Sequence, residues 1–208
     1  MKTINRRNVV IGSAALAGLA LAAPQAFALD VAALNAAPAF GEMTMGPDTA
    51  KVTLIEYASA TCPHCASFYK DTFPALKKEY IDTGKIKFVF REFPHNDAAL
   101  AAFMVARCAP KEKYFPLVDA FFLTQAEWTQ DPLVGLNKIA QQAGFTKESF
   151  DACLKNEAVA KDILAVRTKA EGFGVTGIPT FFLNGELLVL DGENNIEAFR
   201  AKIDPLLV

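Results

Sequence analysis

The distribution of apolar residues predicts strands near both ends of the chain and helices between them. Residues 52–57 (VTLIEY) and 86–93 (IKFVFREF) are short runs rich in β-branched and aromatic side chains, which are typical of buried strands. The residues between these runs follow a helical pattern, which Pro74 must kink or break because proline removes a backbone hydrogen bond. A strand, a helix and a strand in this order predict a βαβ unit.

From residue 97 to about residue 167 the apolar residues recur at helical spacing. The predicted helices cover residues 97–109, 114–125, 133–144, 147–156 and 157–174. Pro110 follows the first of these segments, and Gly144 is the last residue of the third. Both residue types are common at helix ends. The middle of the chain is therefore expected to be all-helical.

A strand pattern returns near the carboxyl terminus. Residues 180–190 (TFFLNGELLVL) contain two apolar runs around Asn184-Gly185, which is the strongest short hairpin signal. Residues 195–203 (NIEAFRAKI) then place their apolar side chains on one helix face. The order is βαβ, a helical block, then ββα. The simplest architecture is one α/β domain that is interrupted by a helical insertion.

The first residues have the three parts of a secretory signal peptide. Lys2, Arg6 and Arg7 are basic, residues 9–23 are apolar, and Ala26-Phe27-Ala28 offers small residues for cleavage after position 28. A membrane anchor is the alternative, but a spanning helix needs about 20 apolar residues and this run is shorter. The arginine pair leaves both the general and the twin-arginine export routes open.

The 208 residues are thus expected to comprise a signal peptide (1–28), the first part of the α/β domain (29–96), a helical insertion (97–167) and the second part (168–208). Without the signal peptide, 18 basic and 23 acidic residues give a net charge of −5. Such a chain has no basic excess for a phosphate backbone, so nucleic-acid binding is not expected. Export would place the chain in an oxidising compartment, where disulfides persist.

The segment Cys62-Pro63-His64-Cys65 lies where a predicted strand meets a predicted helix. If Cys62 is the N-cap residue, Pro63 takes the first helical position, which favours proline. The unpartnered N–H groups of the first turn and the helix dipole then favour a thiolate at Cys62 and lower its pKa. His64 adds a donor and, when protonated, a cation. A stabilised thiolate favours the reduced pair, so the Cys62–Cys65 disulfide is expected to be oxidising.

Other interpretations of this segment are weaker. A zinc site would need two more ligands, and the sequence has no second C-x-x-C and no suitable histidine pair. A purely structural disulfide and chance spacing are the remaining alternatives, but the position between strand and helix favours redox chemistry. No metal or other cofactor is expected.

Three further residues are candidates for the site. Ile178-Pro179 opens the second strand block, and a cis bond there would let the Ile178 backbone pair with an extended substrate. A trans entry into the strand fits the sequence equally well. Glu56 lies within the run VTLIEY, either as a buried acid that moves protons near the cysteines or as an outward-facing strand residue.

The sequence resembles the DsbA family of bacterial periplasmic thiol oxidases over nearly the whole chain after residue 28. The resemblance is carried by VTLIEYASATCPHC (52–65), KIKFVFREFP (85–94), the helical block and VTGIPTFFLNG (175–185). It implies a thioredoxin-like fold interrupted by an all-helical insertion.

The resemblance also implies roles for single residues. Cys62 would be the attacked cysteine, Cys65 its partner and His64 the residue that sets the redox potential. Pro179 would be the cis proline beside them, and Ile178 would contact Cys62 and influence which partners dock. Glu56 matches the buried acid of the family, with Lys87 and Arg91 as candidates for its basic partner.

Cys108 and Cys153 are additional to the best-known members of this family. Both fall in predicted helices of the insertion. Because the chain is expected to be exported, we favour a structural disulfide between them over two free thiols. Outside these motifs, His95 is expected in a surface loop and Trp128 in the packing of the helical block.

The resemblance implies a dithiol oxidase that donates the Cys62–Cys65 disulfide to unfolded or partly folded secreted proteins. It also implies reoxidation by a DsbB-like membrane quinone reductase, a periplasmic location and a monomer. A disulfide isomerase or reductase on the same fold is one alternative. Isomerases of this group carry a sizeable N-terminal domain, for which the residues between Ala28 and Phe40 leave little room. A non-catalytic module that binds peptides or metals is the alternative from another class.

Overall fold

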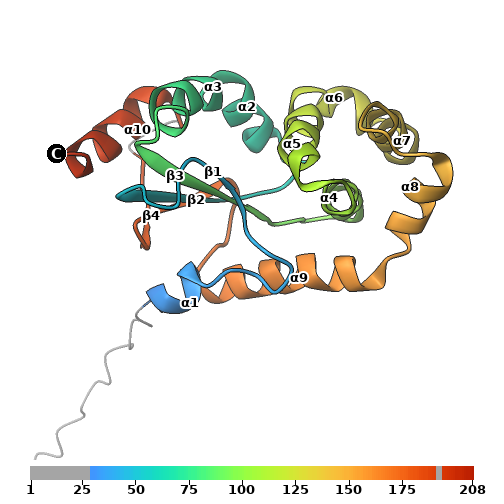
Figure 1. Cartoon of the computed structure of the whole chain (residues 1–208), viewed down its shortest axis with the longest axis horizontal. Helices are drawn as coiled ribbons and strands as arrows, with labels where there is room; N and C mark the ends of the chain where they lie inside the picture. Colours follow the sequence, from blue (N-terminus) through green and yellow to red (C-terminus); the bar gives the residue numbers. More distant parts are fainter. Residues whose placement is uncertain (1–28, 191–193) are drawn as a thin grey trace, which may run out of the picture.

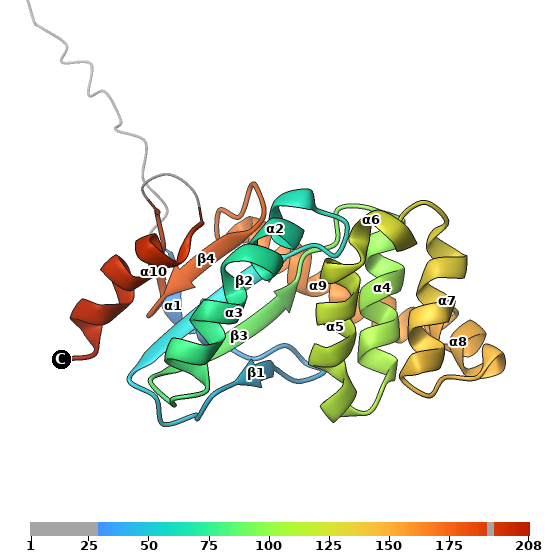
Figure 2. The same ribbon diagram turned by 90° about the horizontal axis from the view of Figure 1, so that it is seen from above.

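The computed structural model describes residues 29–190 and 194–208, so the predicted signal peptide lies outside the described residues. A mixed sheet forms the centre of the α/β part, as Figure 1 shows. Helices α2, α3 and α10 lie on one face of the sheet, and α1 and part of α9 lie on the other. The helical block from α4 to α8 stands beside the sheet (Figure 2).

The five-stranded sheet has the order β1-β3-β2-β4-β5. Its strands are β1 (Met43–Met45), β2 (Val52–Ala58), β3 (Ile86–Glu92), β4 (Thr180–Leu183) and β5 (Glu186–Leu187). β2 is parallel to β3, as a βαβ unit requires, and the other neighbours are antiparallel. Asn184 and Gly185 turn the last hairpin with φ angles of 50° and 88°, so the hairpin prediction is confirmed.

The helices around the sheet are α1 (Val31–Asn35), α2 (Pro63–Asp71), α3 (Phe73–Leu76), the π-helical turn η1 (Lys77–Ile81), α10 (Ile196–Ile203) and the 3-10 turn η3 (Asp204–Leu206). The break expected at Pro74 is present, because α2 ends at Asp71 and Pro74 lies in the first turn of α3. Two short elements, α1 and β1, were not predicted since each spans too few residues to show a period.

The helical block contains α4 (Asp97–Cys108), the 3-10 turn η2 (Lys111–Lys113), α5 (Tyr114–Leu123), α6 (Gln125–Trp128), α7 (Pro132–Gln142), α8 (Lys147–Leu154) and α9 (Glu157–Gly172). α9 runs from the block to the underside of the sheet (Figure 1). The boundary expected at residue 167 falls inside this helix, so a continuous element joins the two parts there.

Alternation along β2 separates two apolar layers. Leu54 and Ala58 point into the layer beneath α2, whereas Ile55 and Tyr57 point into the layer over α9. Aromatic side chains dominate the first layer: Phe181 lies 4.9 Å from Phe68 and 5.1 Å from Phe199, between ring centroids. Burying each such ring contributes about 1.5–3 kcal/mol, so this layer fixes α2 and α10 against the sheet.

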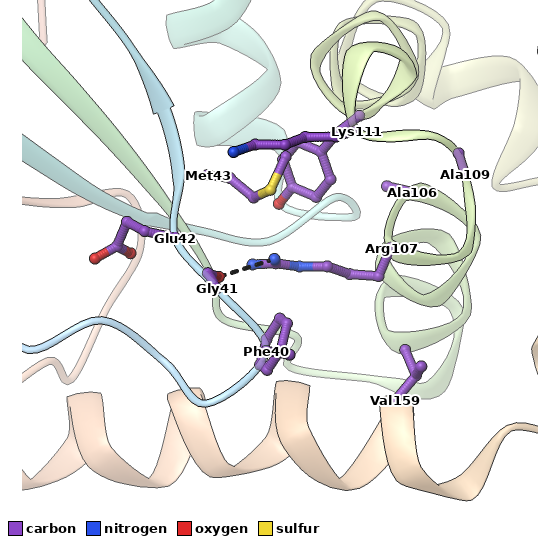
Figure 3. A pocket seen from close by; sticks show the side chains of 10 residues that line it. Phe40, Gly41, Glu42, Met43, Ala106, Arg107, Ala109, Lys111 and Val159 are labelled. Atoms are coloured by element: carbon purple, nitrogen blue, oxygen red, sulfur yellow. Dashed lines mark hydrogen bonds between the residues drawn. The ribbon is translucent and has the colours of Figure 1, made fainter. Parts of the chain in front are cut away.

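A buried ion pair joins the sheet to the helical block. Glu92 at the end of β3 accepts two hydrogen bonds from Arg107 of α4, one of them 2.9 Å long, and a third of 2.5 Å from the Tyr114 hydroxyl. Arg107 also donates to the Gly41 carbonyl and lies 3.9 Å from the Phe40 ring centroid (Figure 3). Because every charge in this cluster has a partner, the block is held at a fixed position on the sheet.

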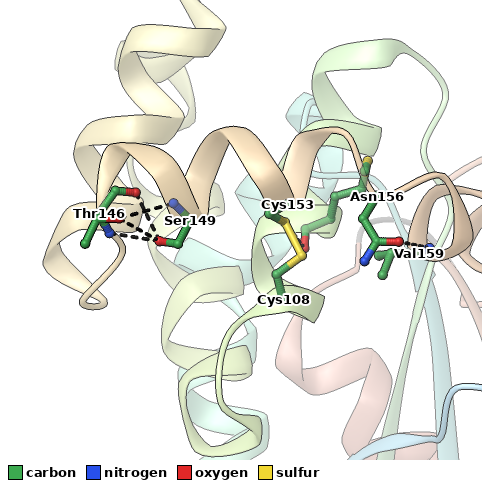
Figure 4. The surroundings of a disulfide bond; sticks show 7 residues. Cys108, Thr146, Ser149, Cys153, Asn156 and Val159 are labelled. Atoms are coloured by element: carbon green, nitrogen blue, oxygen red, sulfur yellow. Dashed lines mark hydrogen bonds between the residues drawn. A yellow bond between two sulfur atoms is a disulfide. The ribbon is translucent and has the colours of Figure 1, made fainter.

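The structure joins Cys108, at the end of α4, to Cys153 of α8, with the Cα atoms 6.0 Å apart (Figure 4). The bond closes a loop of 45 residues that contains α5, α6 and α7. It therefore ties the two ends of the helical block together, as favoured from the sequence.

Replacing both of these cysteines should destabilise the protein without reaching the Cys62 region. For Cys108→Ala with Cys153→Ala we expect a loss of about 2–4 kcal/mol, which corresponds to a fall in melting temperature of about 4–16 °C. Calorimetry of the double variant and of the unmodified protein tests this expectation. Equal melting temperatures would contradict a stabilising role for the bond.

Candidate active site at the start of helix α2

The loop after β2 places Cys62 at the start of α2, as expected. Cys62 is the N-cap residue in an extended conformation, Pro63 occupies the first helical position, and Cys65 lies within the first turn. Both thiols are free in the structure, so it shows the reduced form. Cys62 keeps 6% of its surface exposed, whereas Cys65 has none.

The pKa of the Cys62 thiol is lowered to about 6, mainly by a hydrogen bond with the Cys65 side chain. The amides of Cys65 and His64 and the charge of His64 lower this pKa further, while burial opposes them. No capping hydrogen bond of ordinary geometry forms at Cys62, so these amides act at longer range. The sequence predicts contributions from the helix amides and His64, but the Cys65 thiol, which was not predicted to act, contributes most.

The pKa of the Cys65 thiol is shifted in the opposite direction. Burial raises the pKa of its thiol far above the ordinary range, and the Cys62 sulfur and the Glu56 carboxylate raise it further. At neutral pH the reduced pair therefore consists of a thiolate at Cys62 and a neutral thiol at Cys65. This arrangement gives one accessible leaving group and one protected sulfur.

The Ile178–Pro179 bond is cis, which decides between the two geometries that the sequence allowed. The Cys62 sulfur lies 3.5 Å from the Ile178 carbonyl oxygen, 116 positions away in sequence, and donates a hydrogen bond to it only in the thiol form. A cavity of about 550 Å³ is lined by Cys62, Pro63, His95, Arg167 and residues 175–178, among others. A second cavity of about 760 Å³ is lined by His64, Phe68, Ile178 and Pro179, among others. Ile178 lines both cavities, so an approaching peptide has room beside it.

Glu56 is buried, so the outward-facing interpretation is wrong. Its neighbours Leu54 and Ala58 on β2 place it, by alternation, in the layer beneath α2 and on the side of Cys65. Burial raises the pKa of the Glu56 carboxyl well above its ordinary value, and the Tyr69 hydroxyl partly opposes this rise. Neither carboxyl oxygen has a hydrogen-bond partner among the described residues.

Neither candidate for the basic partner of Glu56 reaches it. Lys87 pairs with Asp48 at 2.8 Å. Arg91 pairs with Glu42 at 2.8 Å and also donates to the Tyr57 hydroxyl. These two predicted partners were wrong. The β3 residue opposite Glu56 is Phe90, and Lys87 and Arg91 lie three and one positions from it. Because side chains alternate along a strand, both point to the other face of the sheet.

Side chains from the helical block and from the residues just before it hold the loop that carries Cys62, and they were not predicted. Asn96, the N-cap residue of α4, donates to the Thr61 hydroxyl at 2.9 Å, and His95 Nδ1 lies 2.8 Å from the Ser59 hydroxyl. Gln125 of α6 donates to the carbonyls of Ala60 and Cys62 at 2.8 and 3.0 Å. No sequence signal marks these contacts, since they join segments that only the fold brings together.

The structure agrees with the positions expected for His95 and Trp128. His95 is exposed in the loop before α4, although it bonds to the loop of Cys62. Trp128 is buried in the helical block, where its indole donates to the Phe121 carbonyl at 2.7 Å.

Within residues 29–190 and 194–208, no three His, Cys, Asp or Glu side chains gather closely enough to hold a metal ion. The helices of this same part of the chain all lack the length or the apolar composition needed to cross a membrane.

Substitutions at His64 should separate its two effects on Cys62. His64→Ala removes the imidazole charge but keeps the amide, and His64→Pro removes both. We expect the pKa of Cys62 to rise above about 6 in the alanine variant and to rise further in the proline variant, with a more reducing pair in each case. Position 64 lies in the first helical turn, where proline is tolerated. Unchanged thiol pKa values and redox potentials in both variants would show that His64 does not act on the cysteine.

A family model described as Thioredoxin matches residues 39–205. A Rickettsia conorii protein, provisionally named a protein-disulfide oxidoreductase, is 34% identical over 170 residues, which are 80% of this chain and 60% of that protein. The chain therefore spans about 60% of the length of this relative.

Two solved structures extend the similarity to three dimensions. Wolbachia pipientis alpha-DsbA1 is 29% identical and superposes with a TM-score of 0.75, covering 84% of this chain and 95% of that chain. A protein-disulfide isomerase of Novosphingobium aromaticivorans is 26% identical with a TM-score of 0.71, covering 83% of this chain and 99% of that chain. By the family model and these structures, the chain belongs to the thioredoxin family, in the DsbA form whose fold is interrupted by a helical insertion.

Proposed function

We propose that this protein is a thiol:disulfide oxidoreductase that works as a dithiol oxidase. The observation that carries the proposal is the unequal state of the two thiols, since the pKa of Cys62 is lowered to about 6 and that of buried Cys65 is raised. A stabilised thiolate at Cys62 favours the reduced pair and makes the disulfide a ready donor.

The proposed reaction starts from the Cys62–Cys65 disulfide. A substrate thiolate attacks the Cys62 sulfur, a mixed disulfide forms, and the Cys65 sulfur leaves with the electron pair and takes up a proton. Glu56 is the nearby acid for this proton, because its raised pKa keeps the carboxyl protonated at a higher pH than usual. A second substrate thiolate then attacks the substrate's own sulfur and expels Cys62 as a thiolate, so two electrons pass from substrate to protein.

Ionisation of Cys62 also makes the reduced protein more stable at higher pH. The pKa of Cys62 is lower in the folded protein than that of an ordinary cysteine, about 8.5, so the free energy of unfolding rises between about pH 6 and 8.5. This contribution is lost as the pH falls through 6, and the oxidised protein lacks it because its sulfurs do not titrate. The difference between the two forms favours disulfide donation at neutral pH.

The substrates would be unfolded or partly folded secreted proteins. Ile178 and Pro179 stand beside Cys62 between two cavities, so an extended peptide could pair with the Ile178 backbone. Backbone pairing carries little sequence information, which suits a donor that serves many clients.

The proposal also includes a cellular location and a route for reoxidising the cysteine pair. The signal pattern in residues 1–28 and the Cys108–Cys153 bond support a periplasmic protein. The reduced pair would be reoxidised by a DsbB-like membrane quinone reductase, and we propose that the protein works as a monomer.

A disulfide isomerase is the second candidate function, because one similar structure carries that name. An isomerase works from the reduced pair, which attacks existing disulfides, whereas an oxidase works from the Cys62–Cys65 disulfide, which the stabilised thiolate makes a ready donor. Equilibration with glutathione tests whether this disulfide is oxidising enough to be donated. We expect a redox potential well above that of thioredoxin, about −270 mV. A value near that of thioredoxin would overturn the oxidase proposal.

Single cysteine variants test the order of events. We expect Cys65→Ser to accumulate mixed disulfides on Cys62 with an unfolded substrate protein that carries a disulfide, since the Cys62 thiolate attacks that disulfide and the resolving sulfur is absent. Cys62→Ser should form neither mixed disulfides nor product, although its fold is retained. Non-reducing gels with mass spectrometry identify the trapped cysteine. If Cys62→Ser promoted substrate folding as well as the unmodified protein does, a non-catalytic binding module would be favoured instead.

A further inference from the structure

Two buried polar groups next to the cysteines lack partners. Four buried side-chain nitrogen or oxygen atoms in the described residues have no hydrogen-bond partner. Three of these atoms belong to Glu56 and Tyr69, whose side chains influence each other's pKa. Native proteins pair nearly all such atoms, so this clustering at one place calls for a functional explanation.

Packing holds the Tyr69 ring in place. The ring stacks on Phe122 of α5 with centroids 4.1 Å apart and on Phe73 of α3 at 4.6 Å. Its edge meets Phe90, the residue opposite Glu56 in the sheet, at 6.3 Å. A phenylalanine would make these same contacts, so packing accounts for the ring but leaves the hydroxyl unexplained.

The hydroxyl lies between the buried acid and the helical block. It lowers the pKa of Glu56, although the two groups stand outside the range of a direct hydrogen bond. Asp119 stands one helical turn before Phe122 on α5, so it shares a helix face with the ring that stacks on Tyr69; it is only partly buried and acts electrostatically on Tyr69. Lys77 in turn acts on Asp119 from near the surface. Exposure thus increases from Cys65 and Glu56, which are fully buried, through Tyr69 at 3% to the partly buried Asp119.

We propose that Tyr69 is a positioning residue for Glu56, and that Tyr69 and Asp119 line a hydrated route by which Glu56 exchanges protons with solvent. This inference rests on the proposed function. When Cys65 must attack a mixed disulfide, its thiol gives a proton to the Glu56 carboxylate. The resulting carboxylic acid passes that proton to water beside the Tyr69 hydroxyl and onwards past Asp119. No electrons move in this step, and the reverse transfer reprotonates Cys65 after donation.

Few other groups compete for this role. The residues opposite Glu56 in the neighbouring strands are Phe90 and Phe181, neither of which titrates. The titratable groups that act on the Glu56–Tyr69 pair or on Asp119 are Cys62, Cys65, Tyr114 and Lys77. Tyr114 is already bonded to Glu92, so its hydroxyl is committed elsewhere.

Tyr69→Phe removes the hydroxyl alone and keeps the ring. We expect the pKa of Glu56 to rise, because the hydroxyl lowers it, and infrared spectra of the carboxyl group measure this without any turnover. We also expect the Cys65-dependent release of a preformed mixed disulfide with glutathione to slow about tenfold, with its pH midpoint moved upwards. Asp119→Asn should slow the same release while leaving the formation of the mixed disulfide at Cys62 unchanged.

Tyr80→Phe is the matched control, since Tyr80 is buried but donates its hydroxyl to Asp204 at 2.7 Å, on the α10 side of the fold. It should change neither the infrared titration nor the release. In a Glu56→Gln background, Tyr69→Phe should have no further effect on release.

Three results would overturn the proposal: an unchanged Glu56 titration in Tyr69→Phe, an unchanged release in both Tyr69→Phe and Asp119→Asn, or an equal slowing of release by Tyr69→Phe with and without Glu56. Should the unmodified protein exchange no disulfides at all, the proposed function fails, and the infrared titration still decides the positioning role of Tyr69.

Discussion

The first turn of α2 holds two sulfur atoms three residues apart in opposite surroundings. Cys62 caps the helix with 6% of its surface exposed, beside the Ile178 carbonyl, whereas Cys65 is fully buried on the side of the sheet that Glu56 faces. The hydrogen bond between the sulfurs enhances the contrast, because it lowers the pKa of one thiol and raises that of the other. The chemistry proposed for the protein depends on this asymmetry, since equal thiols would favour neither donation nor a defined order of attack.

The helical insertion contributes to the site as well as enlarging the fold. Its anchor on the sheet is the Glu92–Arg107 pair. From that fixed position, Asn96 and Gln125 bond to the loop that carries Cys62. On the opposite side of α2, the block supplies the ring that packs against Tyr69. The loop of Cys62 and the Tyr69 ring are thus held partly by residues outside the α/β domain.

Much of this arrangement could be predicted because it is local in sequence. The strand before Cys62, the break at Pro74 and the Asn184-Gly185 hairpin each follow from a short pattern. The environment of Glu56 could not be predicted, since it depends on which strands pair and which face each residue takes. The side chains that hold the active-site loop could not be predicted either, because they come from segments that meet only in the folded chain.

Titration of the Cys62 thiol in the reduced protein tests this account most directly. The ultraviolet absorbance of the thiolate, followed against pH with Cys62→Ser as the blank, reports this group alone because Cys65 stays protonated throughout. The account predicts a midpoint at about 6. A midpoint at about 8.5, as for an ordinary cysteine, would contradict it.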